Sequence, residues 1–590
     1  MISFQNETNL GSCGRSVVRR KLKSDSRTMQ HGSLCSCRDS LVAMKKPTIS
    51  SFNLILVLTV YFSTVLNLSF WRYIVNRLPI TDFHSACFVG SVFLDISVFY
   101  FLIFNLTVVK KVAKPFIIFL LLVGSAASFM MFEYGVYINS SMIQNVLETN
   151  VREATELITA SLLLWVLLFG IAPSALLIVT EIRYQPFKAE MMKRLLGSMI
   201  CLLAVSCSVA FCYKDYAGFG RNNRQAKNLI NVFNFVGGTA TYLKRAHLTP
   251  KSFIVLDNNP RHEDFDSPKS IPTVVIFIVG ETARSMNFSL NGYERKTNPL
   301  LEKQDIVYYK DVIACGTSTA ISVPCMFSHE NQKNFDSSDA KFTENALDLA
   351  QKAGYEVIWL ENDDGCKDVC NRVDKMIGMR DVNNPKYCRG NYCLDEALLD
   401  GLDETLSGIR RNTLIVLHTQ GSHGPKYYQR YPDAFKKFLP TCDTAEIHEC
   451  SREQIVNTYD NTILYTDFVL SSVIDIAKKH PKLEAGVIYV SDHGESLGEN
   501  NIYLHGMPYS IAPDEQTRVP MLIWINETMR KWDHIDYRCL KDSAGKNTYS
   551  HDNLFHSLLG LLEIKTPLYD SRYDLFSPCR VRKQPPAERP

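Results

Sequence analysis

The chain has 590 residues, of which 46% are hydrophobic, and its 64 Lys and Arg residues nearly balance its 61 Asp and Glu residues. This composition excludes a disordered chain, a collagen-like chain and a miniprotein held together only by disulfides. The length allows more than one domain. The apolar residues are unevenly distributed, and the first two hundred residues have the composition of a membrane protein.

Residues 1–43 are polar and basic, with no apolar run long enough for a signal peptide. We expect this segment to be disordered, or to be a dispensable extension ahead of a true start at Met44. We expect a transmembrane domain over 44–213, a linker or bridging helices over 214–264, and a second domain over 265–590.

Five apolar runs follow the N-terminal segment. A helix of about 20 apolar residues crosses the hydrocarbon core of a bilayer, and each run reaches or nearly reaches this length. The alternative, five buried helices of a soluble protein, is disfavoured because such helices seldom run this long without charges. The runs are 52–71, 86–109, 115–131, 160–179 and 195–212.

The charges of the connecting segments give the orientation. Basic residues precede the first run and lie between the second and third runs and between the fourth and fifth. The loop that holds Glu148, Glu153 and Glu156 has only Arg152 as a cation. By the positive-inside rule the N-terminus is cytoplasmic, and an odd number of spans places the chain after residue 212 on the opposite side.

The cysteines point to the same side independently. Ten of the 17 lie after residue 300, and eight of these form four close pairs. The spacings do not provide the two separated C-x-x-C knuckles of a zinc ribbon, so we interpret them as disulfides formed in an oxidising compartment. The pairs are Cys315 with Cys325, Cys366 with Cys370, Cys388 with Cys393 and Cys442 with Cys450, and Cys539 and Cys579 remain as a candidate fifth pair.

Beyond Ile271, short apolar runs such as TVVIFIVGE, TLIVLHTQG, AGVIYVSDHGE and RVPMLIWIN alternate with amphipathic stretches. Continuous apolar strands separated by helices predict a parallel sheet covered on both faces, an α/β fold. In such sheets ligands bind beyond the carboxyl ends of the strands.

Polar residues stand at these strand ends. Glu281 closes the first strand, Asp492 and His493 close a later one, and His418 and His423 follow TLIVL. Taken singly, each has an ordinary structural explanation, such as a helix cap or a satisfied histidine. Two carboxylates and an imidazole at one sheet edge match a zinc ion with mixed oxygen and nitrogen ligands.

A hydroxyl-rich loop follows the first of these ends. Residues 315–325 read CGTSTAISVPC and place Thr317, Ser318 and Thr319 where a disulfide would brace them. A hydroxyl bound to zinc loses its proton readily and can attack phosphorus. The structural alternative is a helix N-cap, and both interpretations can hold together.

Four long motifs carry a family resemblance: GETARSMNFSLNGY (280–293), CGTSTAISVPCMFS (315–328), HGPKYYQRY (423–431) and SDHGESLGENNIYLHGMPYSIAP (491–513). They resemble the phosphoethanolamine transferases of Gram-negative bacteria that modify lipid A, including the mobile colistin-resistance enzymes. The likeness runs from about residue 44 to the C-terminus. It implies a five-helix transmembrane domain and a periplasmic α/β domain of the alkaline-phosphatase superfamily, which is sulfatase-like, in a multi-pass inner-membrane protein.

The resemblance also implies roles for individual residues. It identifies Thr319 as the nucleophile and implies that Glu281, Thr319, Asp492 and His493 ligate one firmly bound zinc ion. His423 and His505 match a second cluster that contacts phosphate or a second zinc. Lys367 matches a lysine near the same phosphate.

In the membrane half, Asn145, Thr149 and Glu153 resemble lipid-headgroup contacts. Their i, i+4, i+8 spacing predicts one helical face, and the alternative is a solvated polar loop. The pair of Cys366 and Cys370 resembles the chromosomal lipid A enzymes, which carry five bridges, more than some colistin-resistance relatives.

The resulting hypothesis is a two-step transfer from phosphatidylethanolamine to a lipid A phosphate through a covalent Thr319 intermediate, giving resistance to polymyxin and other cationic peptides. Alternative acceptors are a lipopolysaccharide core sugar or another periplasmic glycan. Rival classes are a phosphodiesterase or sulfatase that transfers to water, a phosphoglycerol transferase, and a non-catalytic scaffold. We expect a monomer in contact with membrane lipids and no nucleic-acid partner.

Overall fold

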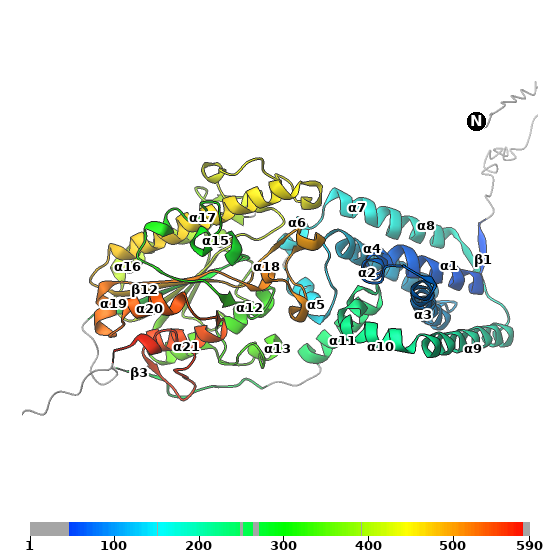
Figure 1. Ribbon diagram of the computed structural model, residues 1–590, viewed down its shortest axis with the longest axis horizontal. Coiled ribbons are helices and arrows are strands. Elements are labelled where there is room, and N and C mark those ends of the chain that lie inside the picture. Colours follow the sequence, from blue (N-terminus) through cyan, green and yellow to red (C-terminus); the bar gives the residue numbers. More distant parts are fainter. Residues whose placement is uncertain (1–45, 150, 248–251, 264–270, 391, 582–590) are drawn as a thin grey trace, which may run out of the picture. The chain divides into compact units, whose positions relative to one another are not determined.

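The computed structural model describes residues 46–149, 151–247, 252–263, 271–390 and 392–581 (Figure 1). The prediction of disorder for residues 1–43 lies outside the described residues. The chain divides into a unit of residues 1–47 and a compact unit of residues 48–590. All elements below belong to the second unit.

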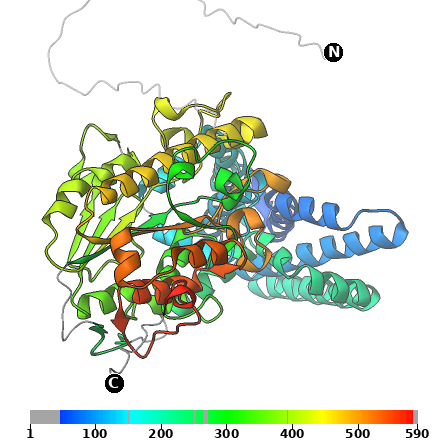
Figure 2. The ribbon, with the colours of Figure 1, turned by 60° about the vertical axis from the view of Figure 1, so that its left-hand side comes forward.

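Five helical segments of the described chain are long and apolar enough to cross a membrane, which confirms the five predicted spans. Figure 2 shows helices of this bundle running side by side. The segments are Ser51–Arg77, Phe83–Thr107, Ala113–Glu133, Ala160–Val179 and Phe187–Phe211. Their elements are α1 (Ser51–Thr64), η1 (Val65–Asn67), α2 (Leu68–Arg77), α3 (Phe83–Thr107), α4 (Ala113–Glu133), α7 (Ala160–Val166), the π-helical turn η2 (Leu167–Ile171), α8 (Ala172–Val179) and α9 (Phe187–Phe211).

The fifth span begins at Phe187, well before the predicted apolar run. The helix extends back through charged residues, two of which are paired: Arg194 Nε donates to Glu190 Oε1 at 2.8 Å, and Ser51 Oγ donates to the same oxygen at 2.5 Å. No residue of α9 is buried. Apolar side chains along it are therefore available to lipid.

Shorter elements connect the spans to the rest of the chain. A parallel strand pair, β1 and β2, joins the start of the first span to the segment after the fourth. Two short helices separate the third and fourth spans, and three elements follow the fifth. The elements are β1 (Thr48–Ser50), β2 (Glu181–Arg183), α5 (Ser140–Glu148), α6 (Val151–Glu156), α10 (Tyr213–Asn222), η3 (Arg224–Leu229) and α11 (Phe233–His247).

The C-terminal part is built on a seven-stranded sheet with the order β5-β15-β12-β4-β11-β7-β8. Strands β12, β4, β11, β7 and β8 are parallel, whereas β15 pairs antiparallel with β12 and β5 antiparallel with β15. The strands are β4 (Thr273–Gly280), β5 (Val307–Tyr309), β7 (Glu356–Glu361), β8 (Lys375–Gly378), β11 (Thr413–His418), β12 (Glu484–Ser491) and β15 (Met521–Ile525).

The prediction of a parallel sheet was therefore wrong for β15. All five residues of this strand are buried, so it reads as a continuous apolar run like its parallel neighbours. A strand that is buried on both faces is apolar at every position, whether it runs parallel or antiparallel to its neighbour, so its sequence does not indicate its direction.

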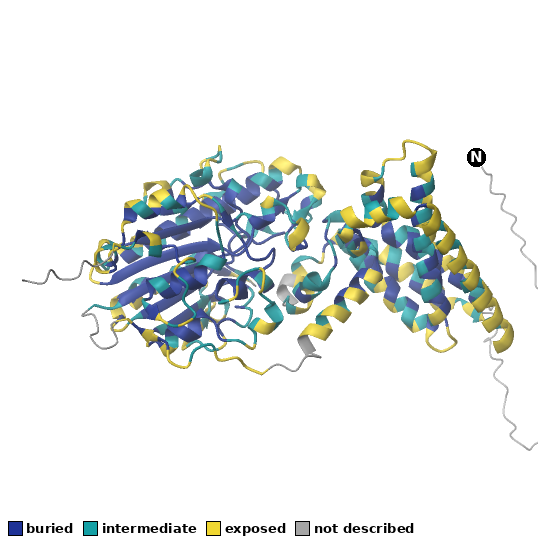
Figure 3. Cartoon of the chain, turned by 60° about the horizontal axis from the view of Figure 1, so that its bottom comes forward, coloured by how far each residue is buried: buried dark blue, intermediate teal, exposed yellow. Residues whose placement is uncertain are grey.

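Helices cover both faces of the sheet, as predicted. Val275 and Phe277 of β4 belong to a core cluster shared with α12, α14, α20 and α21, and Val274 and Ile276 belong to a second cluster shared with α16 and α17. Figure 1 shows α17 on one side of the sheet and α12, α20 and α21 on the other, and Figure 3 shows the strands buried between them. The helices are α12 (Thr319–Met326), α14 (Ala346–Lys352), α16 (Leu402–Gly408), α17 (Arg452–Lys478), α19 (Glu527–Trp532), α20 (Tyr537–Ala544) and α21 (Asp552–Leu561).

Disulfides join all ten C-terminal cysteines in the expected pairs. Four described cysteines outside this part are unpaired. Within the described residues the disulfides all lie after the fifth span, which agrees with the predicted oxidising side of the membrane. Cys315 is bonded to Cys325, Cys366 to Cys370, Cys388 to Cys393, Cys442 to Cys450, and Cys539 to Cys579.

Candidate active site

Four neighbouring strands deliver polar residues to one edge of the sheet. Ser491 of β12 lies in register with Gly280 of β4, and His418 of β11 with Glu361 of β7. Because these strands are parallel, the residues that end or follow them meet at the same edge. The predicted group Glu281, Asp492 and His493 is brought together there, and all three residues are fully buried.

The atoms of this group converge on one point. His493 Nε2 lies 3.2 Å from Asp492 Oδ2 and 3.5 Å from Glu281 Oε1. Asp492 Oδ1 accepts hydrogen bonds from the backbone N–H groups of Thr282 and His493, at 3.1 and 2.7 Å. The backbone thus fixes the carboxylate and leaves Oδ2 directed at the imidazole.

These residues fit a divalent cation. Asp492 Oδ2 is buried and has no hydrogen-bond partner among the described residues. His493 Nδ1 lies 2.9 Å from Gly494 O, an arrangement in which Nδ1 carries the proton and Nε2 offers its lone pair to the cluster. Two carboxylates and one neutral imidazole, with a hydroxyl alongside, form a donor set that suits zinc.

Burial makes the group costly without a cation. Burial and the negative charge of Asp492 raise the pKa of Glu281 well above its ordinary value, and burial raises the pKa of Asp492 to about 7. Burial and the nearby His505 lower the pKa of His493 well below its ordinary value. A bound divalent cation would compensate the negative charges of the two buried carboxylates.

Thr319 stands beside this group. Its Oγ1 lies 3.2 Å from Glu281 Oε2 and 3.5 Å from His493 Nε2. Thr319 is the first residue of α12, and the N-cap position is Ser318, whose side chain makes no cap hydrogen bond. The N-cap interpretation is therefore wrong for Thr319, because its hydroxyl is directed at the carboxylate and not at the helix backbone. The helix N-terminus favours an anion here.

A cavity opens in front of Thr319 and collects most of the remaining predicted residues. His423 and His505 face each other with ring centroids 5.4 Å apart, and Lys367 Nζ donates to Asp364 O at 3.1 Å. The cavity lies between α5 and the sheet edge. Its lining residues are Asn145, Glu148, Thr149, Ser318, Thr319, Ala320, Asp363, Lys367, His423 and His505.

The predicted single helical face of Asn145, Thr149 and Glu153 was wrong. Helix α5 ends at Glu148, and Thr149 is its C-cap with an extended backbone. The Thr149 hydroxyl donates to Asn145 O at 2.5 Å, and the Thr149 N–H donates to the same oxygen at 2.8 Å. Asn145 and Thr149 both reach the cavity, whereas the side chain of Glu153, in α6, lies outside the described residues.

The structure also adds residues that the sequence analysis did not assign to the site. Glu495 Oε2 lies 2.9 Å from His505 Nδ1, and its Oε1 accepts a hydrogen bond from the Tyr427 hydroxyl at 2.5 Å. Asp363 lies just beyond the end of β7 and lines the cavity. The strand-end rule that found Glu281 and Asp492 applies equally to the acidic residues after β7, so this signal was present in the sequence.

A helix N-terminus that carries a hydroxyl beside a carboxylate and imidazole cluster, in a domain that follows five apolar helices, indicates a membrane-anchored enzyme of the sulfatase class. Residues 273–564 match the Sulfatase family, and residues 96–247 match the family described as phosphoethanolamine transferase EptA/EptB.

Relatives of known type share nearly the whole chain. Phosphoethanolamine transferase EptA of Escherichia coli is 38% identical over 545 residues, which cover 91% of this chain and 98% of that protein. Phosphatidylethanolamine transferase Mcr-2 of Escherichia coli is 32% identical over 528 residues, covering 88% of this chain and 96% of that protein. The integral membrane protein lipooligosaccharide phosphoethanolamine transferase A (EptA) from Neisseria meningitidis gives a TM-score of 0.87 at 39% identity, covering 90% of this chain and 99% of that chain.

The chain therefore belongs to the phosphoethanolamine transferase family, as its motifs indicated. It is an inner-membrane protein with a sulfatase-like periplasmic domain.

Proposed function

We propose that this enzyme transfers phosphoethanolamine from phosphatidylethanolamine to a phosphate of lipid A, through a covalent intermediate on Thr319. The observation that carries the proposal is the position of Thr319 Oγ1, 3.2 Å from Glu281 Oε2 at the N-terminus of α12 and open to the cavity. A hydroxyl so placed can be deprotonated and can reach a phosphorus atom held in that cavity.

The proposed reaction has two displacements at phosphorus. In the first, Thr319 Oγ1 gives its proton to the Glu281 carboxylate, 3.2 Å away, and bonds to phosphorus as the bond from phosphorus to the diacylglycerol oxygen breaks. In the second, an oxygen of the lipid A phosphate bonds to phosphorus as the bond to Oγ1 breaks, and Thr319 regains a proton. Zinc held by Glu281, Thr319, Asp492 and His493 would favour the alkoxide and offset charge on the phosphoryl oxygens.

We assign the proton donor for the departing diacylglycerol to His505. The Glu495 carboxylate lies 2.9 Å from its Nδ1, so the carboxylate orients the ring. Its side chain lines the cavity together with His423 and Lys367. Lys367 and His423 are assigned to the phosphoryl oxygens, whose charge rises during the transfer.

The ethanolamine end of the donor is assigned to the α5 side of the cavity. Asn145 Oδ1 is buried and has no hydrogen-bond partner among the described residues, and an ammonium group needs such acceptors. Thr149 stands next to it. Both lipids reach this cavity from the membrane, which accounts for the attachment of a sulfatase-like domain to five spans.

The product change follows from charge. The added ethanolamine amine offsets negative charge on lipid A and weakens its attraction for cationic peptides such as polymyxin. For the acceptor, the support is the similar Neisseria meningitidis protein, a lipooligosaccharide phosphoethanolamine transferase.

Mass spectrometry of lipid A tests the proposal in cells that express wild type, Thr319→Val or Thr319→Ser. Wild type should add phosphoethanolamine, Thr319→Val should add none because it keeps the shape but lacks the hydroxyl, and Thr319→Ser should retain part of the activity. Digestion of wild type supplied with donor alone should give a peptide with phosphoethanolamine on Thr319. Equal modification by wild type and Thr319→Val would refute the nucleophile.

The same samples separate the rival reactions. Phosphoethanolamine found on a core sugar would support the proposed donor reaction and show that the acceptor is the core sugar and not a lipid A phosphate. Free phosphoethanolamine released without any modified lipopolysaccharide would indicate a hydrolase of the phosphodiesterase type.

A further inference from the structure

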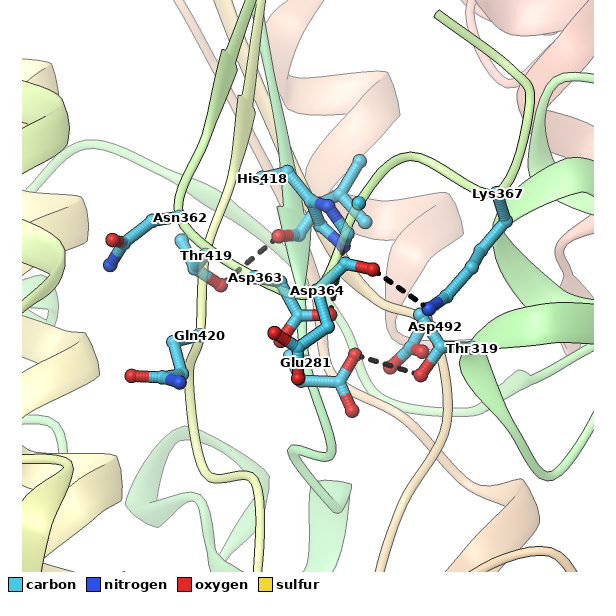
Figure 4. Close-up of polar contacts among 12 residues, drawn as sticks. Glu281, Thr319, Asn362, Asp363, Asp364, Lys367, His418, Thr419, Gln420 and Asp492 are labelled. Atoms are coloured by element: carbon cyan, nitrogen blue, oxygen red, sulfur yellow. Dashed lines mark hydrogen bonds and ion pairs between the residues drawn. The ribbon is translucent and has the colours of Figure 1, made fainter. Parts of the chain in front are cut away.

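A second group of potential metal ligands lies on the far side of Glu281 from Thr319. Ligand atoms of Glu281, Asp363 and His418 all lie within 4.8 Å of one another, and all three residues are buried. They come from the ends of β4, β7 and β11, which are adjacent in the sheet. Figure 4 shows Asp363 and His418 near Glu281, with Thr319 and Asp492 on its other side.

The His418 ring is held in one orientation. Its Nδ1 lies 2.9 Å from Glu361 Oε2, and the same oxygen accepts a hydrogen bond from Trp359 Nε1 at 2.8 Å. When Nδ1 carries the proton and donates it to Glu361 Oε2, Nε2 carries the lone pair. A carboxylate that orients a metal-binding imidazole in this way is the usual partner of a histidine ligand.

His418 Nε2 is the atom that requires an explanation. The residue is 0% exposed, and this nitrogen has no hydrogen-bond partner among the described residues. It points toward Asp363 Oδ2, at 4.0 Å, too far for a hydrogen bond. Two ligands at about 2.0–2.2 Å from a tetrahedral zinc ion stand roughly 3.3–3.6 Å apart, so a small inward shift of the two side chains would let an ion bind between them.

The charges around Asp363 also indicate a bound cation. Asp363 is 5% exposed, and the neighbouring cation Arg380 binds Asp364 instead, with Nη1 2.8 Å from Asp364 Oδ1. Glu281 adds a second carboxylate to the same buried space. Buried carboxylates are retained when they are paired or bind a metal.

We propose that Glu281, Asp363 and His418 bind a second zinc ion, with Glu361 as the residue that positions His418. Glu281 would bridge this ion and the one beside Thr319, so the inference rests on the proposed function. One imidazole and two carboxylates suit zinc and leave a coordination position open. The ligand group does not include His423 or His505. Because it lies across Glu281 from Thr319, the second ion fixes the Glu281 carboxylate and offsets its charge.

Zinc content per molecule tests the proposal on the full chain in detergent, equilibrated with buffered zinc and measured by elemental mass spectrometry. His418→Gln and Asp363→Asn should each hold one zinc fewer than wild type. The control His480→Gln, a histidine away from the site that pairs with Asp403, should keep the wild-type content. Glu361→Gln should weaken binding of this second ion about 10- to 100-fold.

Folding is checked by circular dichroism and by the disulfide content of each variant, and Asp363→Asn serves if His418→Gln does not fold. Equal zinc content in wild type, His418→Gln and Asp363→Asn would overturn the proposal and leave His418 as a protonated partner of Glu361 and Asp363. Asp492→Asn reports on the other site: full zinc content in that variant would contradict the proposed centre beside Thr319, whatever the His418 variants show.

Discussion

Replacing Asp492 by Asn should stabilise the metal-free protein at neutral pH, although it should remove zinc. Burial raises the pKa of the Asp492 carboxyl to about 7 in the folded chain, against an ordinary value of 3.8. Between these two values the folded state binds a proton that the unfolded state releases. The free energy of unfolding therefore falls as the pH rises from about 4 to about 7, and the penalty is fully present above pH 7.

The magnitude follows from the same two values. Their difference corresponds to about 4 kcal/mol at 1.36 kcal/mol per pH unit, and sharing of the repulsion with Glu281 lowers the expected gain to about 2–4 kcal/mol. Asn keeps the oxygen that accepts from the backbone N–H groups of Thr282 and His493, so the local hydrogen bonds survive. It lacks the negative charge that the buried site disfavours.

The assay is thermal unfolding of the full chain in detergent and chelator, for wild type and Asp492→Asn, from pH 4 to pH 8. The two midpoints should coincide near pH 4 and separate toward pH 8, with the variant higher. In excess zinc the order should reverse, because only wild type gains binding energy from the metal. A metal-free variant that melts below wild type at pH 8 would refute the electrostatic reasoning.

Further predictions concern the surroundings of the site. Lys367→Met should lower kcat/KM about 10²- to 10³-fold and leave zinc content unchanged, since it removes charge from the phosphoryl oxygens but no ligand; unchanged transfer would exclude this role. Arg430→Met should cost about 3 kcal/mol, because it leaves the Glu156 carboxylate unpaired, and the double variant with Glu156→Gln should recover part of the loss in melting temperature. Joint replacement of Cys315 and Cys325 by Ser should lower stability by about 3 kcal/mol under oxidising conditions but not under reducing ones.

Much of the fold could be predicted because buried strands and membrane-spanning helices have continuous apolar sequences. The five spans and the strands β4, β7, β11 and β12 are continuous apolar runs, and their lengths separate membrane helices from strands. The direction of β15 could not be predicted, since a fully buried strand looks the same in either direction. The start of the fifth span at Phe187 depends on pairing of Glu190 with Arg194, which polarity alone does not show.

Some residues of the site could likewise be predicted from the sequence, and others could not. Glu281 and Asp492 were found because they follow apolar strands, and the structure places them together. The roles of Glu495 and Glu361 depend on single hydrogen bonds to His505 and His418 from distant parts of the chain, which no local pattern encodes. The helix break at Thr149 likewise shows only in the backbone, which becomes extended there although the Thr149 N–H still donates to Asn145 O.

One contact connects the segment between the third and fourth spans to the catalytic loop. Arg430 Nη2 lies 2.8 Å from Glu156 Oε2, and Arg430 Nε donates to His423 O at 2.8 Å. Ser161 Oγ adds a second link by donating to Glu446 Oε2 at 2.8 Å. The planar guanidinium of Arg430 thus bonds to both segments at once. The segment that contributes Asn145 and Thr149 to the cavity is thereby tied to the backbone of His423, which lines the same cavity, as the proposed headgroup site would require.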